Sequence, residues 1–148
     1  LNGRYAGVLP LDFYSGGGKR TPNMARFEVA SHAGLQNWAR TKLVLHLQSH
    51  SSCDRLRYLL ALDATPLIAD LTHFEFYYPS LRAWEHYVPV KGDLSDLQNQ
   101  VEYCLVVNRS HCRAIAAAST AWVFEHLRYE DVLEYTAAMI RDFSNSLR

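Results

Sequence analysis

The sequence is poor in the residues that mark several classes of protein. Its three cysteines, Cys53, Cys104 and Cys112, are an odd number without a Cys-x-x-Cys pair, which indicates neither a disulfide framework nor a structural zinc site. Neither sign of charge is in excess: 15 Lys and Arg balance 15 Asp and Glu, so no overall field would attract nucleic acid or an acidic membrane. No apolar run approaches the roughly 20 residues of a membrane span, and the first residues lack a signal-peptide pattern.

The remaining composition is that of an ordinary soluble domain. Of 148 residues, 49% are hydrophobic and 20% are charged, which leaves enough apolar material for one sizeable core. We find no linker and no internal repeat, and therefore predict a single domain over residues 1–148. The chain begins with Leu1 rather than Met, as a processed or excerpted chain would.

The order of apolar patterns predicts the fold class. Short apolar runs at residues 8–14, 42–47, 65–69 and 86–90 predict strands. Apolar residues at helical spacing follow the second run and recur three times beyond residue 94, with Ser110 and Asp131 as candidate helix-start residues. Strands separated by helices, without two-residue hairpin turns, favour a parallel sheet covered by helices. We predict an α/β fold of the Rossmann-like type.

The junction that follows the second predicted strand is the strongest local signal for function. A loop that leaves the carboxyl end of a parallel strand and enters a helix presents free N–H groups, which bind phosphate well. In this loop Arg55 would stand in the first helical turn, where its guanidinium can make paired hydrogen bonds to a phosphate, while Ser51 and Ser52 add neutral donors. The alternative is a plain serine cap beside a surface arginine.

Other candidate motifs carry less chemistry. Gly16–Lys19 resembles half a nucleotide-binding loop, but Phe13 and Arg20 stand where the Walker pattern needs Gly and Ser or Thr. His46 and His50 are a close pair without a carboxylate-rich partner, so we predict no metal site.

Two single residues remain as candidates. Cys53 could have a lowered pKa at a helix start, but no orienting triad can be placed around it. Glu75 lies in an unusually aromatic segment, residues 73–90, most of whose rings we expect in the core; its carboxylate could accept hydrogen bonds from ribose hydroxyls.

The order of three segments resembles one known family. These segments are KLVLHLQSHSSCDRLRYLLALDATPLI, HFEFYYPSLRAWEHYVPVKGDLSDLQNQVEYC and SHCRAIAAASTAWVFEHLRYEDVLEY. They resemble the C-terminal half of glycosyltransferase family 90, the capsule-associated and protein O-glucosyltransferase-like enzymes. The resemblance covers about residues 40–143, and EFYYPSL with EHYVPVKGDLSDL is its most specific part.

The resemblance implies a fold and an activity. Family members have the GT-B arrangement, two Rossmann-like domains facing across a cleft, and this chain would be the donor-binding domain, incomplete without the N-terminal acceptor half. The implied reaction transfers glucose or xylose from a UDP-sugar to a protein or glycan hydroxyl with inversion. UDP-glucose or UDP-xylose would be the donor substrate, without a cofactor, a metal ion or a nucleic-acid partner. The implied location is the secretory pathway, in the endoplasmic reticulum or Golgi.

The resemblance also implies which residues hold the donor. Arg55 and Arg26 would neutralise the diphosphate, and the catalytic carboxylate would belong to the N-terminal half, so no catalytic residue is assigned in this chain. The implied donor contacts lie in two loops: Gly17, Arg26, His50, Ser51, Ser52, Cys53, Asp54 and Arg55.

Departures from the family pattern keep a second hypothesis open. Cys53 stands where the family often has Ser, Ser49 where Gly is usual, Ser15 where Arg is usual and Ala83 where Pro is common. A thiol is a weaker hydrogen-bond donor than a hydroxyl. The alternative is therefore a non-catalytic, degenerate relative that binds a nucleotide, a glycan or a protein without turnover.

Overall fold

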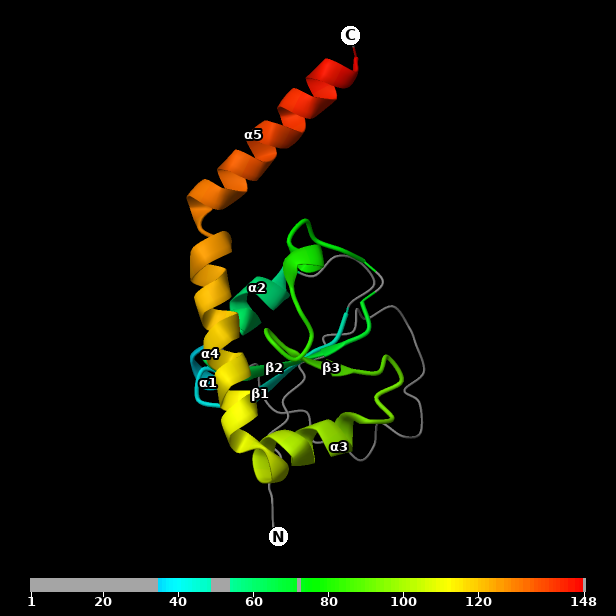
Figure 1. Ribbon diagram of the computed structural model, residues 1–148, viewed down its shortest axis with the longest axis vertical. Helices are drawn as coiled ribbons and strands as arrows, with labels where there is room; N and C mark the ends of the chain where they lie inside the picture. The colour runs from blue at the N-terminus through cyan, green and yellow to red at the C-terminus, as the bar shows by residue number, and fades with distance from the viewer. Residues whose placement is uncertain (1–34, 49–53, 72, 148) are drawn as a thin grey trace, which may run out of the picture. The chain divides into compact units, whose positions relative to one another are not determined.

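The computed structural model describes residues 35–48, 54–71 and 73–147. The chain divides into two compact units, Leu1–Trp38 and Ala39–Arg148. In the first unit the described part is the short helix α1 (Leu35–Trp38). The elements of both units are labelled in Figure 1.

Several sequence predictions fall outside the described residues. They include the strand at residues 8–14 and the candidate donor residues Gly17, Arg26, His50, Ser51, Ser52 and Cys53. The single domain over residues 1–148 also stays a prediction.

The second unit contains a three-stranded parallel sheet in the order β1-β2-β3. The strands are β1 (Leu43–His46), β2 (Thr65–Ala69) and β3 (Val88–Val90), and all three lie within the apolar runs that predicted them. Leu67 is opposite Leu45 in β1 and Val88 in β3. Every residue of β2 is buried, as expected for the middle strand of a covered parallel sheet.

Pro66 is compatible with this central strand because of its place in the register. The Thr65 N–H bonds to the Lys42 carbonyl on the β1 side, at 2.9 Å, so the next backbone nitrogen faces the β3 side. There the pairing begins only at Leu67 with Val88. Proline therefore removes no hydrogen bond from the ladder.

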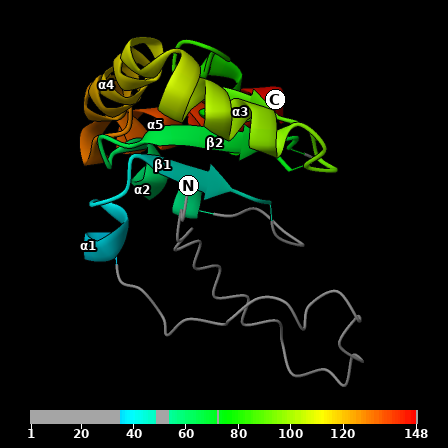
Figure 2. The same ribbon diagram turned by 90° about the horizontal axis from the view of Figure 1, so that it is seen from below.

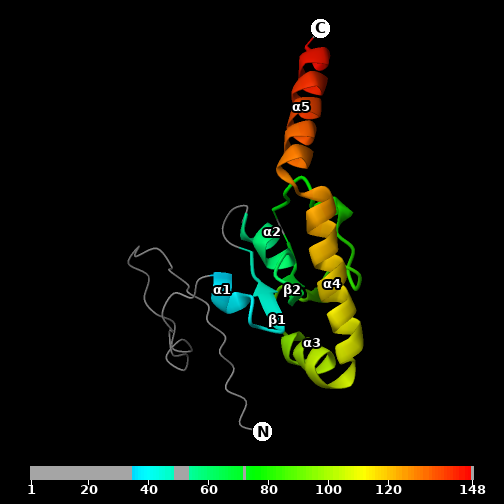
Figure 3. The same cartoon turned by 90° about the vertical axis from the view of Figure 1, so that its left-hand side faces the viewer.

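Helices occupy most of the other residues that the structure describes. Figures 2 and 3 show α3 and α4 together along one side of the strands. The helical segments are α2 (Arg55–Leu60), the 3-10 turn η2 (Tyr78–Ser80), α3 (Leu97–Glu102), the π-helical turn η3 (Tyr103–Val107), α4 (Arg109–His126) and α5 (Tyr129–Ser146). The α/β fold with a parallel sheet is thus confirmed.

Among the described residues the core consists of two hydrophobic clusters that meet at β2 and α4. Neighbouring residues of β2 belong to different clusters, because successive side chains of a strand point to opposite faces. The first cluster is Leu56, Leu60, Ile68, Tyr77, Tyr78 and Trp122, and the second is Leu67, Val88, Val90, Cys104, Cys112 and Ile115. The helix α4 contributes to both, so it fastens α2 and the sheet to one another.

The structure corrects two expectations near the start of α4. Cys104 and Cys112 form a disulfide bond, which the odd cysteine count did not indicate. The helix is capped by Asn108 rather than begun at Ser110: the Asn108 Oδ1 accepts from the His111 N–H at 3.2 Å and from the Ser110 hydroxyl at 3.1 Å. An asparagine cap satisfies backbone N–H groups as well as serine does.

Candidate functional site

The candidate site lies at the carboxyl ends of the parallel strands. In open α/β sheets ligands bind in the crevice outside these ends. Here β1 ends at His46 and is followed by Leu47, while Asp70 follows β2. The Asp70 carboxylate accepts a hydrogen bond from the Gly92 N–H, just beyond β3, at 3.0 Å. This contact fixes the ends of β2 and β3 relative to each other.

Arg55 begins α2 and reaches back to the end of β1. Its terminal nitrogen donates to the Leu47 carbonyl at 3.2 Å, and the residue is half-buried. Its Nε is fully buried and has no hydrogen-bond partner in the described part of the chain. A buried N–H without a partner costs free energy, on the order of 1–3 kcal/mol. Arg55 is therefore not the freely solvated arginine of the alternative interpretation, and it has a donor to spare.

His46 lies beside Arg55 and is also short of partners. It is the last residue of β1, fully buried, and neither ring nitrogen has a hydrogen-bond partner among the residues that the structure describes. Burial, reinforced by the positive charge of Arg55, lowers the pKa of His46 to about 4. The ring is therefore neutral near pH 7, with one nitrogen as donor and the other as acceptor.

Sequence reasoning missed the role of His46 as part of this edge. The signal was present in the strand pattern, because Val44 and His46 are alternate residues of β1 and both are buried. A histidine on the buried side of a strand needs polar partners or a lowered pKa.

Glu75 and Asp54 come together in a second part of the site. Both line a cavity of about 80 Å³, whose other lining residues are Arg57, Phe76, Tyr77, Leu127 and Val132. Sites for drug-sized ligands have volumes from about 300 Å³. This cavity alone is therefore too small for a complete nucleotide-sugar, although it could take one part of such a molecule.

The polar groups around this cavity are partly neutralised. Asp54 and Arg57 form an exposed ion pair at 3.6 Å, which contributes little to stability. Arg57 also donates to the Tyr58 hydroxyl at 2.7 Å and lies over that ring. Burial, together with the nearby Tyr78 and Glu75, raises the pKa of Tyr77 far above its ordinary value, so its phenol stays protonated.

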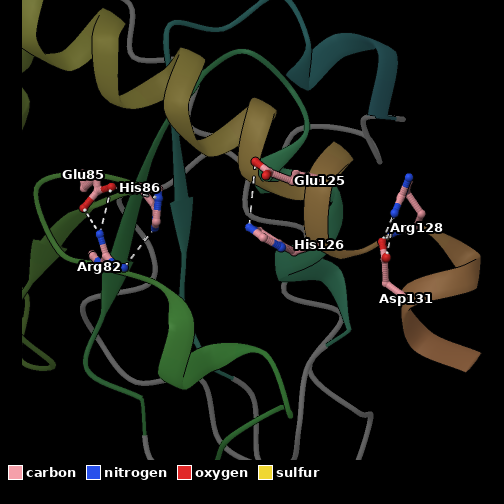
Figure 4. A network of polar contacts seen from close by, with 7 residues as sticks. All are labelled: Arg82, Glu85, His86, Glu125, His126, Arg128 and Asp131. Carbon is pink, nitrogen blue, oxygen red and sulfur yellow. Dashed lines mark hydrogen bonds and ion pairs between the residues drawn. The ribbon is translucent and has the colours of Figure 1, made fainter. Parts of the chain in front are cut away.

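The junction between α4 and α5 closes one side of the cavity. The Arg128 N–H donates to the Asp131 carboxylate at 2.8 Å, and the Arg128 guanidinium donates to the same group at 2.9 Å and 3.0 Å (Figure 4). The backbone bond is one half of a capping box, in which the Asp131 carboxylate satisfies the N–H of the residue before α5, and the guanidinium bonds add an ion pair. They hold Leu127 and Val132 on either side of the turn.

The aromatic segment divides between core and surface. Tyr77 and Tyr78 are buried in the first cluster, as predicted for most of these rings. Phe74, Phe76 and Trp84 are exposed instead. Packing in the core therefore explains the presence of Tyr77 and Tyr78, but not that of the three exposed rings.

The structure places three of the nine candidate donor residues. Asp54 and Glu75 share a cavity, whereas Arg55 contacts the end of β1. Outside the described residues lie Gly17, Arg26, His50, Ser51, Ser52 and Cys53. Within residues 35–48, 54–71 and 73–147, no three His, Cys, Asp or Glu side chains gather as a metal site would require. In the same ranges no helix combines the length and apolar character of a membrane span.

A parallel α/β sheet with an arginine and acidic groups at its carboxyl edge defines a class of ligand-binding domain. Comparison with known proteins identifies the family. The model of glycosyl transferase family 90 matches residues 21–148. The chain therefore belongs to glycosyltransferase family 90.

Individual relatives include named transferases. Protein O-glucosyltransferase 1 of Rattus norvegicus is 34% identical over 73 residues, which are 49% of this chain and 18% of the relative. Protein O-glucosyltransferase 1 of Homo sapiens is 25% identical over 119 residues, 80% of this chain and 30% of the relative. An uncharacterized protein of Invertebrate iridescent virus 3 is 34% identical over 96 residues, 64% of this chain and 9% of the relative. The chain thus spans less than a third of each of these relatives.

Proposed function

We propose that this chain is the donor-binding, Rossmann-like domain of an inverting glycosyltransferase of the GT-B type. Its donor would be UDP-glucose or UDP-xylose, and its acceptor a hydroxyl of a protein or glycan. Membership of family 90 supports glycosyl transfer in general. The observation that carries the donor site is the half-buried Arg55, whose Nε has no partner in the described part of the chain and which stands at the carboxyl edge of the sheet.

The proposed chemistry follows from charge. When the bond between the sugar and UDP breaks, negative charge develops on the departing diphosphate. Arg55, with Arg26 from the earlier loop, would stabilise that charge, and donors fixed in advance are most effective where charge develops. A carboxylate outside this chain would take the proton from the acceptor hydroxyl. No step in this proposal needs a metal ion.

The same proposal assigns the small cavity. Glu75 would accept hydrogen bonds from the ribose hydroxyls, while residues His50 to Cys53 would surround the phosphates. Asp54 lines the cavity with Glu75, so the ribose would lie between these two acceptors, and the phosphates would lie outside the cavity, towards Arg55. The cavity is small because it would hold only the ribose part of the donor.

We also propose a location in the secretory pathway. The Cys104–Cys112 disulfide supports this location, since such bonds persist in oxidising compartments and are rare in the cytosol. The names of the O-glucosyltransferase relatives agree with an acceptor that is a protein.

The test is a calorimetric titration of the chain with UDP, UDP-glucose and UDP-xylose. We expect saturable binding that weakens by about 1–3 kcal/mol, roughly 5-fold to 150-fold, in Arg55→Ala, because a hydrogen bond to a charged group is lost. Arg113→Ala is the matched control, since Arg113 is an exposed arginine of α4. Unchanged affinity in Arg55→Ala would remove the proposed role of that residue.

A second readout separates the proposal from its alternative. Hydrolysis or transfer of the sugar by a longer protein that includes this chain would support an active enzyme. Binding of UDP without any turnover in that protein would instead identify a degenerate relative, as the departures at Cys53 and Ser15 would explain.

A further inference from the structure

A ring cluster at the opposite ends of the strands has features of a second binding site. Trp84 lies before β3, not after it. It contacts Tyr103 and His111, and the residue after His111, Cys112, accepts a hydrogen bond through its carbonyl from Thr65, the first residue of β2. The cluster is therefore at the amino ends of β2 and β3, whereas Arg55 and Asp70 are at the carboxyl ends.

The backbone at Trp84 is strained. Its φ is +65°, in the left-handed region that bulky side chains rarely adopt. Such a conformation costs on the order of 1–3 kcal/mol and persists only where the surroundings enforce it. Positions of this kind are concentrated at ligand clamps and active sites.

The loop around Trp84 is built to enforce that conformation. The Trp84 N–H donates to the Tyr87 carbonyl at 2.7 Å, and the Arg82 N–H donates to the buried His86 Nδ1 at 3.1 Å. The Arg82 guanidinium forms an ion pair with Glu85 at 3.2 Å (Figure 4). The loop therefore holds its indole at the surface without leaving a net charge beside it.

The indole stands against a polar support. The Trp84 and His111 rings are nearly parallel, 13° apart with centroids at 6.2 Å, and Tyr103 meets Trp84 edge-on at 5.6 Å. Asn108 donates to the Tyr103 hydroxyl at 3.3 Å, and that hydroxyl is 2.8 Å from the His111 Nδ1. Nδ1 of His111 is thus used within the cluster, and Nε2 is the second polar atom of the ring, a donor or an acceptor according to the tautomer.

One ring of the cluster belongs to a rare backbone element, a π-helical turn. Tyr103 begins the π-helical turn η3, and the Asn108 N–H donates to the Tyr103 carbonyl at 2.8 Å. Turns of this type occur frequently at functional sites. Two independent departures from ordinary backbone geometry thus meet at three contacting rings.

We propose that Trp84, Tyr103 and His111 form a carbohydrate-binding platform for a neutral sugar residue of a glycan. A pyranose has an apolar C–H face, which stacks on the electron-rich face of an indole, and a rim of hydroxyls, which can donate to or accept from a polar group such as His111 Nε2. Trp84 is 40% exposed, so part of the indole is accessible. Three rings are too small a surface for a stable protein partner, which needs about 800 Å². This site is separate from the proposed donor site and does not depend on it.

The test is a titration of the chain with cellotriose and xylotriose, followed by NMR of the tryptophan indole N–H signals. The chain has three tryptophans, and Trp84→Tyr identifies the signal of Trp84 by its loss. We expect a saturable shift of that signal with a dissociation constant on the order of 1 mM. Saturating UDP leaves the shift in place, because the two sites are at opposite ends of the strands.

Variants distinguish the platform from other sites. Trp84→Ala is expected to weaken trisaccharide binding at least about tenfold, while Trp84→Tyr retains part of it. In both variants binding is followed by a second signal, that of the His111 ring. Phe124→Ala is the matched control, since Phe124 is an exposed ring of α4 outside the cluster, and its affinity stays unchanged.

Two results would overturn the platform. One is the absence of a saturable Trp84 shift with either trisaccharide in the folded wild-type chain. The other is trisaccharide binding that Arg55→Ala removes and Trp84→Tyr leaves intact, which would assign the sugar to the carboxyl edge. Neither result depends on the folding of Trp84→Ala.

Discussion

The helices α4 and α5 have the same length, 18 residues each, but opposite relations to the rest of the second unit. Five residues of α4 are buried: Cys112, Ile115, Ala116, Ser119 and Trp122. No residue of α5 is buried, and most of its large apolar side chains are exposed. Within the second unit, Figure 1 shows α4 alongside α2 and β2, and α5 continuing beyond them.

The difference shows that two helices can be stabilised by different means. The helix α4 gains its stability from packing, and its Ser119 hydroxyl even donates to the Leu60 carbonyl in the core at 3.0 Å. The helix α5 is held at its start by the bonds from Arg128 to Asp131, and its ring contacts include the stacked pair of Phe76 with Tyr135 at 4.4 Å. Helices without tertiary packing are marginal in water. Local opening should therefore begin in α5.

The largest expected effect tests this contrast directly. Ile115→Ala should lower the free energy of unfolding by about 2–5 kcal/mol, because Ile115 is fully buried in the second cluster and its loss leaves a cavity. Ile140→Ala, the same change on an exposed position of α5, should alter it by less than about 0.5 kcal/mol. Urea unfolding of both variants measures the difference.

Equal losses in the two variants would contradict the contrast. They would mean that the exposed face of α5 is covered in solution. The large apolar side chains exposed on this helix include Leu133, Met139, Ile140 and Phe143.

The sequence predicted the strands and helices of the second unit better than it predicted which elements pack against each other. Residues 65–69 were predicted as a strand with the bounds that the structure shows, because a short apolar run between polar turns has few other uses. Both long helices were predicted from their apolar stripes. The stripe shows that a helix has an apolar face, but it does not show what covers that face. The contrast between α4 and α5 therefore needed the structure.

The site was predictable only in part, for similar reasons. The place of Arg55 at a strand–loop–helix junction followed from the order of patterns. The isolation of the His46 ring and the Cys104–Cys112 bond did not, because both depend on which residues approach one another in space. The count of three cysteines argued against pairing, yet two of them pair and Cys53 is left over.

The next prediction concerns the free energy of unfolding at low pH. The core and α5 should lose stability at different pH values. The native pKa of His46 is about 4, below its ordinary value of 6.5, so between these values the unfolded chain binds a proton that the native chain does not. Stability is then fully present above about pH 6.5 and falls as the pH decreases towards 4. The loss should reach about 3 kcal/mol.

Unfolding by urea at several pH values measures this loss. His46→Leu should flatten the slope between pH 6.5 and 4, while other groups titrate alike in both proteins, including His86, whose pKa burial also lowers. The hydrogen bond from Arg128 keeps the pKa of Asp131 below its usual range, so the cap of α5 should be lost only at a lower pH. Identical slopes in wild type and His46→Leu would show that His46 is solvated.

The smallest of these effects concerns the disulfide at the start of α4. Cys104 and Cys112 are eight residues apart, and a loop of this length should contribute about 2–3 kcal/mol by restricting the unfolded chain. The double change Cys104→Ser and Cys112→Ser should lower the free energy of unfolding by that amount. Hydrogen exchange should then increase in the first turns of α4, where Thr65 donates to the Cys112 carbonyl at 2.8 Å, and stay constant in α5.

Cys53→Ser is the control, because it leaves the disulfide intact. If a reducing agent destabilised the Cys53→Ser protein no more than it does the double variant, the two sulfurs would not be bonded in solution, and α4 would owe its stability to packing alone.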